Sequence, residues 1–214
     1  SDVMIPAFLA AYTGRSASNS ALDLFPGILS MMPNWRVTYS GLSKLEFFKK
    51  YFKSVTLNHA YRSTYSVGSY STFQNFHSYM GDWGFVDDIQ TGIPVPSSMY
   101  DVSAVSINEQ FSPLLGVDVT FKNGINTKVE YKTTRILNLS LAANQIVESS
   151  TKDFVLGMGY KIMGLELFPG RNKKDSKNKI SNDLALRMDV SFRNQSALAR
   201  DIQQVTTQAT SGHK

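Results

Sequence analysis

Histidine is the residue type most often used for metal binding and for proton transfer near neutral pH, and the chain has three, at His59, His77 and His213. They lie in different segments, and no two have the His-x-x-x-His spacing that places a pair of imidazoles on one helix face. The sequence has no cysteine, which excludes thiolate metal sites and disulfide bonds. We therefore expect no metal site, and we expect His59 to lie among aromatic residues near an interface.

Two other short motifs have chemical meaning in other contexts. Asp87-Asp88 could bind calcium, but no ligand loop of alternating Asp or Asn with a closing Glu surrounds it, which favours a solvated loop. Gly157-x-Gly159 lacks the third glycine and the helix of a dinucleotide site, and it indicates close packing in a strand. Because no nucleophile is matched with a base, we expect neither an enzyme active site nor a cofactor.

Tyrosines are the remaining candidates. They could form part of an aromatic girdle at a membrane interface, or they could be core residues of a soluble sheet. Neither interpretation makes them catalytic. The residues concerned are Tyr61, Tyr65, Tyr70, Tyr79 and Tyr100.

The segment 183–193 gives the clearest indication of the elements that hold these side chains. Apolar and polar residues alternate along it, which is the period of a β-strand with two different faces. The apolar set is Leu184, Leu186, Met188, Val190 and Phe192, and the opposite set is Asp183, Arg187, Asp189, Ser191 and Arg193.

A similar alternation predicts a strand over residues 55–67 that is longer than most strands of soluble sheets. One face has Val55, Leu57, His59, Tyr61, Tyr65 and Val67, and the other has Thr56, Asn58, Arg62, Thr64 and Ser66.

Between residues 102 and 160 the alternation recurs in pieces joined by tight connections, which predicts antiparallel hairpins. Asn123-Gly124 predicts a type I′ hairpin turn. Residues 112–116 break one run, and residues 149–153 predict a further turn before the strand 154–162. Arg135 falls on the apolar side of its strand, which requires either a bulge near Thr133-Thr134 or a position at a membrane rim.

Three segments lie outside this pattern. Residues 1–33 predict a loop with helical character, residues 42–52 predict a short amphipathic helix suited to a membrane interface, and residues 74–98 predict a long ordered loop. No linker divides the chain. The first residues lack a basic flank followed by an apolar core, so we expect an internal piece of a longer protein.

Composition agrees with strands that have one polar face, since hydrophobic residues make up 42% of the chain and charged residues 18%. No stretch reaches the roughly 18 apolar residues of a membrane helix. A barrel strand needs only about 9–11 residues and shows alternate ones to lipid, so the lack of such a stretch does not exclude the membrane. Together with the alternating segments above, we interpret the sequence as an all-β, antiparallel transmembrane β-barrel segment.

The net charge of +5 could suggest nucleic acid, but Lys and Arg concentrate mainly in 44–53 and 171–179. The second run interleaves no aromatic residues, which favours a solvated loop over a nucleic-acid site. A loop of that charge could also meet lipid phosphates. We expect no nucleic-acid partner.

Six strings in the sequence are distinctive enough to compare with known families. They lie at 34–45, beginning Asn34-Trp35-Arg36-Val37, at 47–59, 61–70, 113–120, beginning Pro113-Leu114-Leu115-Gly116, at 127–135 and at 154–162. Together they resemble the SprA/Sov family. Members of the family form the outer-membrane translocon of the type IX secretion system in Bacteroidota, and some also serve gliding motility. The resemblance covers nearly the whole chain.

The resemblance implies a single-chain barrel far larger than this piece, in the cell outer membrane. Residues 1–214 would be part of one barrel domain, with 1–33 leading into it and 34–214 supplying about eight strands and their loops. It also implies that folded cargo proteins with C-terminal sorting domains pass through the barrel, assisted by a plug protein and a shuttle protein.

The two predicted faces follow from this interpretation. The residues expected to face outer-membrane lipid are Val55, Leu57, Tyr61, Leu184, Leu186, Met188, Val190 and Phe192. The residues expected to face the lumen are Arg62, Asp183, Arg187 and Asp189. Three alternatives remain: a generic porin or nutrient transporter, a soluble β-sheet adhesion module, and a hydrolase on a β-scaffold.

Overall fold

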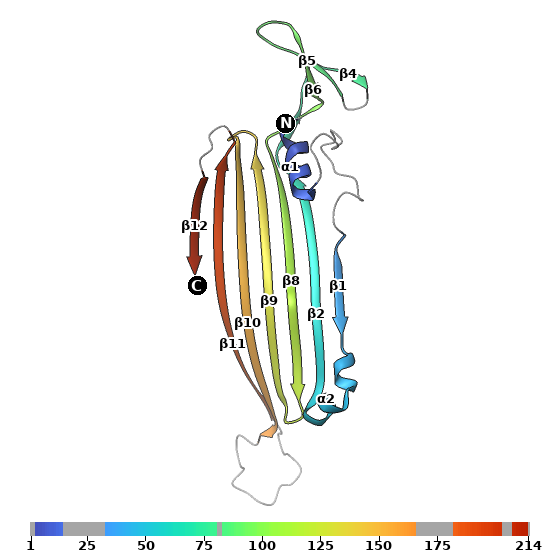
Figure 1. The fold of residues 1–214 in the computed structure, drawn as a ribbon, viewed down its shortest axis with the longest axis vertical. Coiled ribbons are helices and arrows are strands. Elements are labelled where there is room, and N and C mark those ends of the chain that lie inside the picture. Colours follow the sequence, from blue (N-terminus) through green and yellow to red (C-terminus); the bar gives the residue numbers. More distant parts are fainter. Residues whose placement is uncertain (1–2, 15–32, 81–82, 166–181, 203–206, 214) are drawn as a thin grey trace, which may run out of the picture.

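The computed structural model describes residues 3–14, 33–80, 83–165, 182–202 and 207–213 (Figure 1). This part of the chain is mostly antiparallel β-sheet with few helices, so the all-β prediction is confirmed. The basic run 171–179 and most of the segment 1–33 lie outside the described residues.

One long sheet dominates the structure. Its seven strands follow the order β1-β2-β8-β9-β10-β11-β12, and every neighbouring pair is antiparallel. The strands are β1 (Trp35–Tyr39), β2 (Phe52–Val67), β8 (Ala104–Phe121), β9 (Ile125–Ser140), β10 (Gln145–Leu165), β11 (Asn182–Asp201) and β12 (Thr207–His213). The five central strands have 16 to 21 residues each, well above the usual five or six.

The chain leaves the sheet between β2 and β8 and forms an excursion beyond its end, at the top of Figure 1. A two-stranded stem pairs β3 (Tyr70–Thr72) with β7 (Tyr100–Val102). A three-stranded sheet joins β4 (Phe76–Met80), β5 (Trp83–Asp87) and β6 (Pro94–Ser98). The prediction of a loop over residues 74–98 is therefore wrong. Pro94 and Pro96 fit a strand here because β6 lies at the edge of its sheet.

Among the described residues, two α-helices and a 3₁₀ helix accompany the main sheet. Helix α1 (Met4–Thr13) ends at Gly14, whose φ of 69° is the left-handed conformation common after a helix. The 3₁₀ helix η2 (Gly41–Lys44) and helix α2 (Glu46–Tyr51) join β1 to β2. The short helix predicted for 42–52 is thus present, though its first turn is 3₁₀.

The connections between the central strands differ from the prediction in two places. The chain turns at residues 141–144 and not at 149–153, which lie inside β10. At the β8–β9 hairpin only Gly124 has a positive φ, and its N–H donates to the carbonyl of Phe121. The hairpin is where Asn123-Gly124 predicts it, but its loop has three residues ending in a left-handed glycine and is not a type I′ turn.

The register also settles the position of Arg135. Strand β9 pairs with β10 without a shift from Ser140 to Ile125, so no bulge occurs at Thr133-Thr134. The irregularity lies in β8, between Phe111 and Leu115, where the break over 112–116 was expected. Arg135 therefore stays on the same face as the apolar residues of β9.

The compact core lies at one end of the sheet, where α1 covers β8 and β9. Ile5, Phe8 and Leu9 of the helix pack against the strands. Their partners, all at most 8% exposed, are Val102, Val105, Ile107, Leu137 and Leu139.

Candidate functional site

The two faces of the sheet differ in chemistry over its length below α1. Residues directly opposite each other in an antiparallel sheet point to the same side, so the register identifies what shares a face. Three successive rows across the sheet make an apolar band: Val55, Val119, Thr127, Met158 and Met188; Leu57, Val117, Val129, Leu156 and Val190; and Leu115, Tyr131, Phe154 and Phe192.

All eight residues expected to face lipid lie on the apolar face, which also has α1 at its other end. The five in β11 are 37% to 63% exposed, and Leu57 is half-buried. Val55 and Tyr61, in contrast, are only 3% and 2% exposed. These two side chains are therefore covered by neighbours within the chain itself.

An aromatic row crosses the sheet where the band ends on the side of α1. The ring of Tyr61 stacks on Trp35 with centroids 4.4 Å apart, and it contacts Phe111 at 4.8 Å. His59 contacts Trp35 and Phe111 at 6.3 and 5.9 Å, so its expected place among aromatic residues is confirmed. Tyr131, Phe154 and Phe192 continue the rings across β9 to β11 one row lower.

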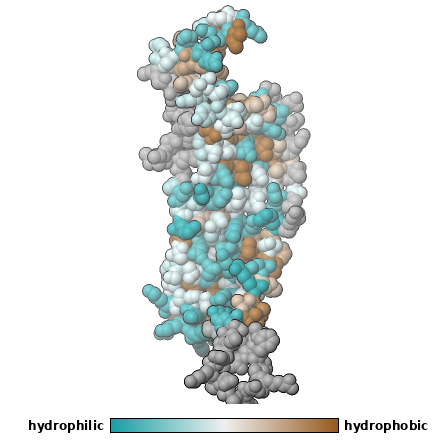
Figure 2. Space-filling model, turned by 180° about the vertical axis from the view of Figure 1, so that it is seen from behind, coloured by the Kyte–Doolittle hydropathy of each residue, from teal (hydrophilic) through white to brown (hydrophobic). Residues whose placement is uncertain are grey.

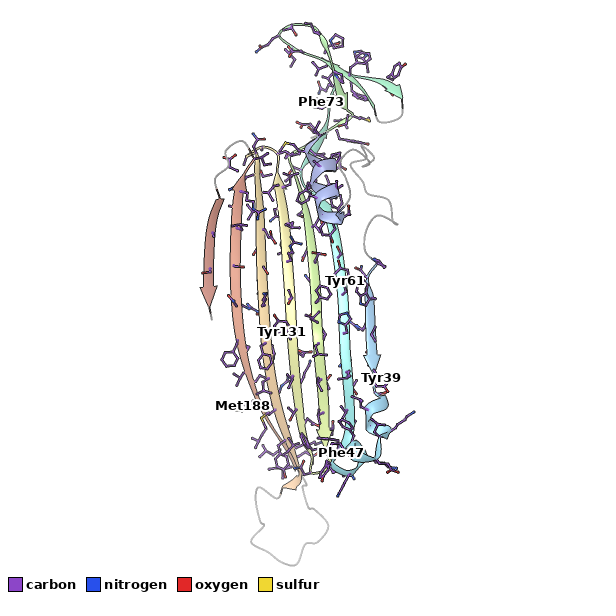
Figure 3. The ribbon with its side chains drawn as sticks, viewed as in Figure 1. Tyr39, Phe47, Tyr61, Phe73, Tyr131 and Met188 are labelled. Atoms are coloured by element: carbon purple, nitrogen blue, oxygen red, sulfur yellow. The ribbon has the colours of Figure 1, made fainter. Side chains whose placement is uncertain are left out.

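A second aromatic group lies at the opposite end of the band, around α2. Phe52 and Phe121 pair across β2 and β8 with centroids 5.0 Å apart, and Phe48 contacts Phe52 at 5.8 Å. Phe47 contacts Phe48 and Tyr51. Figure 3 shows Tyr61 and Phe47 at two different levels of the sheet, with Tyr131 and Met188 between them.

The other face of the sheet is polar and has several ion pairs. Glu130 accepts from Lys128 and Lys132 at 2.8 and 3.0 Å, and Arg193 pairs with Asp153 at 2.7 Å. Figure 2 shows hydrophilic and intermediate side chains over most of the side seen from behind, with scattered hydrophobic ones.

All four residues expected to face a lumen share this polar face, as the pairing register shows. Asp183 pairs with Lys161 at 2.8 Å, and Arg187 pairs with Asp189 at 2.9 Å. Arg62 lies higher on the same face, opposite Gln110.

Gly157 and Gly159 open a hollow in the polar face. The space, about 450 Å³, is lined by residues that include Asp118, Lys128 and Arg187. A Cβ on Gly157 would stand 2.7 Å from Oδ1 of Asp189, so the glycine makes room for that carboxylate. The predicted close packing is found at Gly157, whereas Gly159 has only ordinary contacts around it.

A charged group separates the apolar band from the core under α1, on the same face. We call it the Glu109 cluster: Tyr12, Glu109, Arg135 and Glu148. Glu109 accepts hydrogen bonds from Tyr12 and Tyr61, both at 2.8 Å. Arg135 lies between the two carboxylates, 2.8 Å from Glu148 and 3.7 Å from Glu109. Sequence reasoning missed this cluster, although Arg135 on an apolar face was its signal.

The motifs first considered for chemistry have structural roles. Asp88 Oδ1 accepts from the N–H groups of Gln90 and Thr91, and these bonds, made to the charged form, lower the pKa of Asp88. His77 lies 3.3 Å from Asp87 and against the ring of Phe85. In the part of the chain that the structure describes, no three His, Asp or Glu side chains gather as metal ligands.

The five candidate tyrosines do not form one girdle. Only Tyr61 lies in the aromatic row, and Tyr65 packs against the core under α1. Tyr70 and Tyr100 meet edge to face in the stem of the excursion, and Tyr79 is 87% exposed beyond it. The rings of the two aromatic groups come mostly from phenylalanines, and the sequence analysis assigned none of these to a girdle.

Comparison with known proteins adds no identification, because neither a protein-family model nor a curated protein sequence matches the chain. Among the described residues, the helices are too short or too polar to cross a bilayer.

Proposed function

We propose that this chain forms part of the wall of a transmembrane β-barrel, with its apolar face toward lipid. One contrast on that face supports the proposal most directly. Beyond the Glu109 cluster the apolar residues are covered by α1, with Ile107 fully buried, whereas below it residues such as Met188 and Phe192 are about 60% exposed. Lipid would cover the second group as α1 covers the first.

The height of the band agrees with a bilayer. On β11 it runs from Leu184 to Phe192, about nine residues, and a tilted membrane strand needs about 9–11. Aromatic rings border both ends of the band, as they do at the two interfaces of barrels in membranes. The remaining half of each long strand, with the Glu109 cluster and α1, then projects beyond the bilayer.

The edges of the sheet support the closure of a barrel by further strands. Among the described strands, β1 pairs only with β2 and β12 only with β11. Unpaired N–H and C=O groups cannot face hydrocarbon, so a sheet in a membrane must continue around until it closes. The polar face then lines the lumen, with its ion pairs and its glycine hollow in water.

The resemblance to the SprA/Sov family supports a more specific proposal, that the barrel is a protein-conducting channel of type IX secretion in the cell outer membrane. Its partners would be folded cargo proteins with C-terminal sorting domains, a plug protein and a shuttle protein. Pore width depends on strand number, so a porin or nutrient transporter is the main competitor. No residue needs to act as a catalyst in either.

Cysteine labelling in a bilayer tests the orientation of the faces, since the chain has no cysteine of its own. Met188 and Arg187 are neighbours, and both are well exposed in the chain taken alone. A charged, membrane-impermeant maleimide should label Arg187→Cys in the reconstituted barrel and should leave Met188→Cys unreacted until the lipid is removed. Equal labelling of both variants in the bilayer would refute the proposed orientation.

Imaging of the full-length protein tests the channel proposal separately. An interior wide enough for a folded domain is the expected result. A narrow interior would reject the protein-conducting channel and leave the membrane orientation standing.

A further inference from the structure

Five lysines gather at the end of the sheet where α2 lies, and we call them the lysine cluster: Lys44, Lys49, Lys50, Lys53 and Lys122. They come from η2, α2, the start of β2 and the β8–β9 turn. Lys53 and Lys122 directly follow Phe52 and Phe121, whose rings meet across the two strands. All five lysines are exposed.

The lysine cluster has little compensating negative charge. No carboxylate of the described residues lies within 4.0 Å of any of its five amino groups, and α2 has Glu46 as its one acidic residue. Lys161, at the same end but on the polar face, does have such a partner in Asp183. Within the described residues, the positive charge of the cluster is therefore not compensated.

Apolar side chains stand beside these amino groups. Phe47 is 70% exposed, Leu45 53% and Tyr51 52%, and Lys50 Nζ lies 5.6 Å from the centre of the Tyr51 ring. Figure 3 shows Phe47 at the lower end of the sheet. Exposed aromatic rings interleaved with unpaired lysines suit the boundary between hydrocarbon and headgroups, where rings bury and ammonium groups reach the polar layer.

We propose that the lysine cluster is a binding site for the phosphate groups of anionic lipids in the leaflet that borders this end of the band. The inference rests on the proposed membrane orientation, because only that orientation brings the cluster to headgroup level. Each basic residue at an anionic surface strengthens binding about fivefold. The neighbouring rings would hold the cluster at that depth.

Spin-labelled lipids test the proposal on the full-length barrel reconstituted in phosphatidylcholine vesicles. Labelled phosphatidylglycerol should be enriched several-fold over labelled phosphatidylcholine in the immobilised layer around the protein. The double variant Lys49→Glu, Lys50→Glu should lose most of this enrichment. The control Arg36→Glu, Arg62→Glu makes the same charge change at two exposed residues of the polar face and should retain it.

The possible outcomes test the lysine site and the proposed membrane orientation independently. An immobilised layer without headgroup preference, or equal loss in both double variants, would overturn the lysine site while leaving the membrane orientation intact. Absence of an immobilised layer for either lipid would overturn the orientation itself. Inorganic phosphate at moderate concentration should not abolish the enrichment if the site recognises lipid, and abolition would show that it takes free phosphate instead.

Discussion

The hydroxyl of Tyr12 in α1 donates a 2.8 Å hydrogen bond to the carboxylate of Glu109 in β8, 97 positions later in the sequence. The same carboxylate oxygen accepts from Tyr61 of β2. This arrangement fixes the end of α1 to two adjacent strands at the level where the apolar band stops.

We expect Tyr12→Phe to loosen α1 without unfolding the sheet. A hydrogen bond to a charged group contributes about 1.5–3 kcal/mol, and Glu109 keeps Tyr61 and Arg135 as partners in the variant, which favours the lower end. Hydrogen exchange of residues 4–13 should accelerate roughly tenfold. Tyr79→Phe, at an exposed tyrosine, is the matched control. Unchanged exchange in Tyr12→Phe would show that apolar packing alone holds the helix.

A second prediction concerns the apolar band. Met188→Arg should lower the free energy of unfolding in lipid vesicles by about 2–4 kcal/mol, because in the proposed orientation a charge would face the middle of the bilayer. Arg187→Ser removes only an exposed ion pair with Asp189, so it should change stability by less than about 1 kcal/mol. Urea titrations of the two variants give the comparison. Equal tolerance at both positions would contradict the assigned faces.

A third prediction separates two glycines by their backbone conformation. Gly124 has a φ of 87°, so Gly124→Ala should destabilise the protein by about 1–2 kcal/mol through strain in the hairpin. Gly159 has no positive φ, and a Cβ there would meet nothing closer than 3.7 Å. Gly159→Ala should therefore be close to neutral in the same unfolding assay. A larger loss at Gly159 than at Gly124 would be inconsistent with this account.

A fourth prediction concerns alkaline pH. Burial raises the pKa of Tyr65 to about 12 from its ordinary value of 10.0, in the part of β2 that projects beyond the proposed bilayer. The folded state thus holds the phenolic proton more tightly than the unfolded state, so stability should fall as pH rises from about 10 towards 12. Difference absorption between the parent protein and Tyr65→Phe should show phenolate forming in that upper range. A midpoint of Tyr65 ionisation near pH 10 would refute the predicted rise in its pKa.

The local sequence pattern was sufficient to predict those parts of the fold that depend on residues close together in the sequence. The alternation from Leu184 to Phe192 predicts both faces of β11, and Asn123-Gly124 locates the hairpin between β8 and β9. The error at 149–153 has a physical cause: at this height of β10 both faces are polar, so a strand lacks alternation and resembles a turn. Recognising residues 149–153 as part of a strand would have required a longer alternating apolar pattern before and after them.

Contacts between distant residues could not be predicted in the same way. Arg135 was recognised as out of place, but its partners Glu109 and Glu148 lie on other strands and depend on the register of both. The bulge between Phe111 and Leu115 shifts that register, and sequence spacing does not give its size. The burial of Ile107 likewise depends on α1, a helix that lies about a hundred residues earlier in the sequence.

The Glu109 cluster also determines how such a barrel would respond to membranes of different thickness. Ion-paired groups resist transfer into hydrocarbon, and α1 already occupies the apolar surface beyond them, so that end of the band has a fixed height. The other end is bordered by Phe47, Tyr51 and long lysine side chains, which can extend or fold back by several ångströms. Hydrophobic mismatch would therefore be absorbed almost entirely at the α2 end, and the projecting half of the sheet would keep a constant elevation above the bilayer.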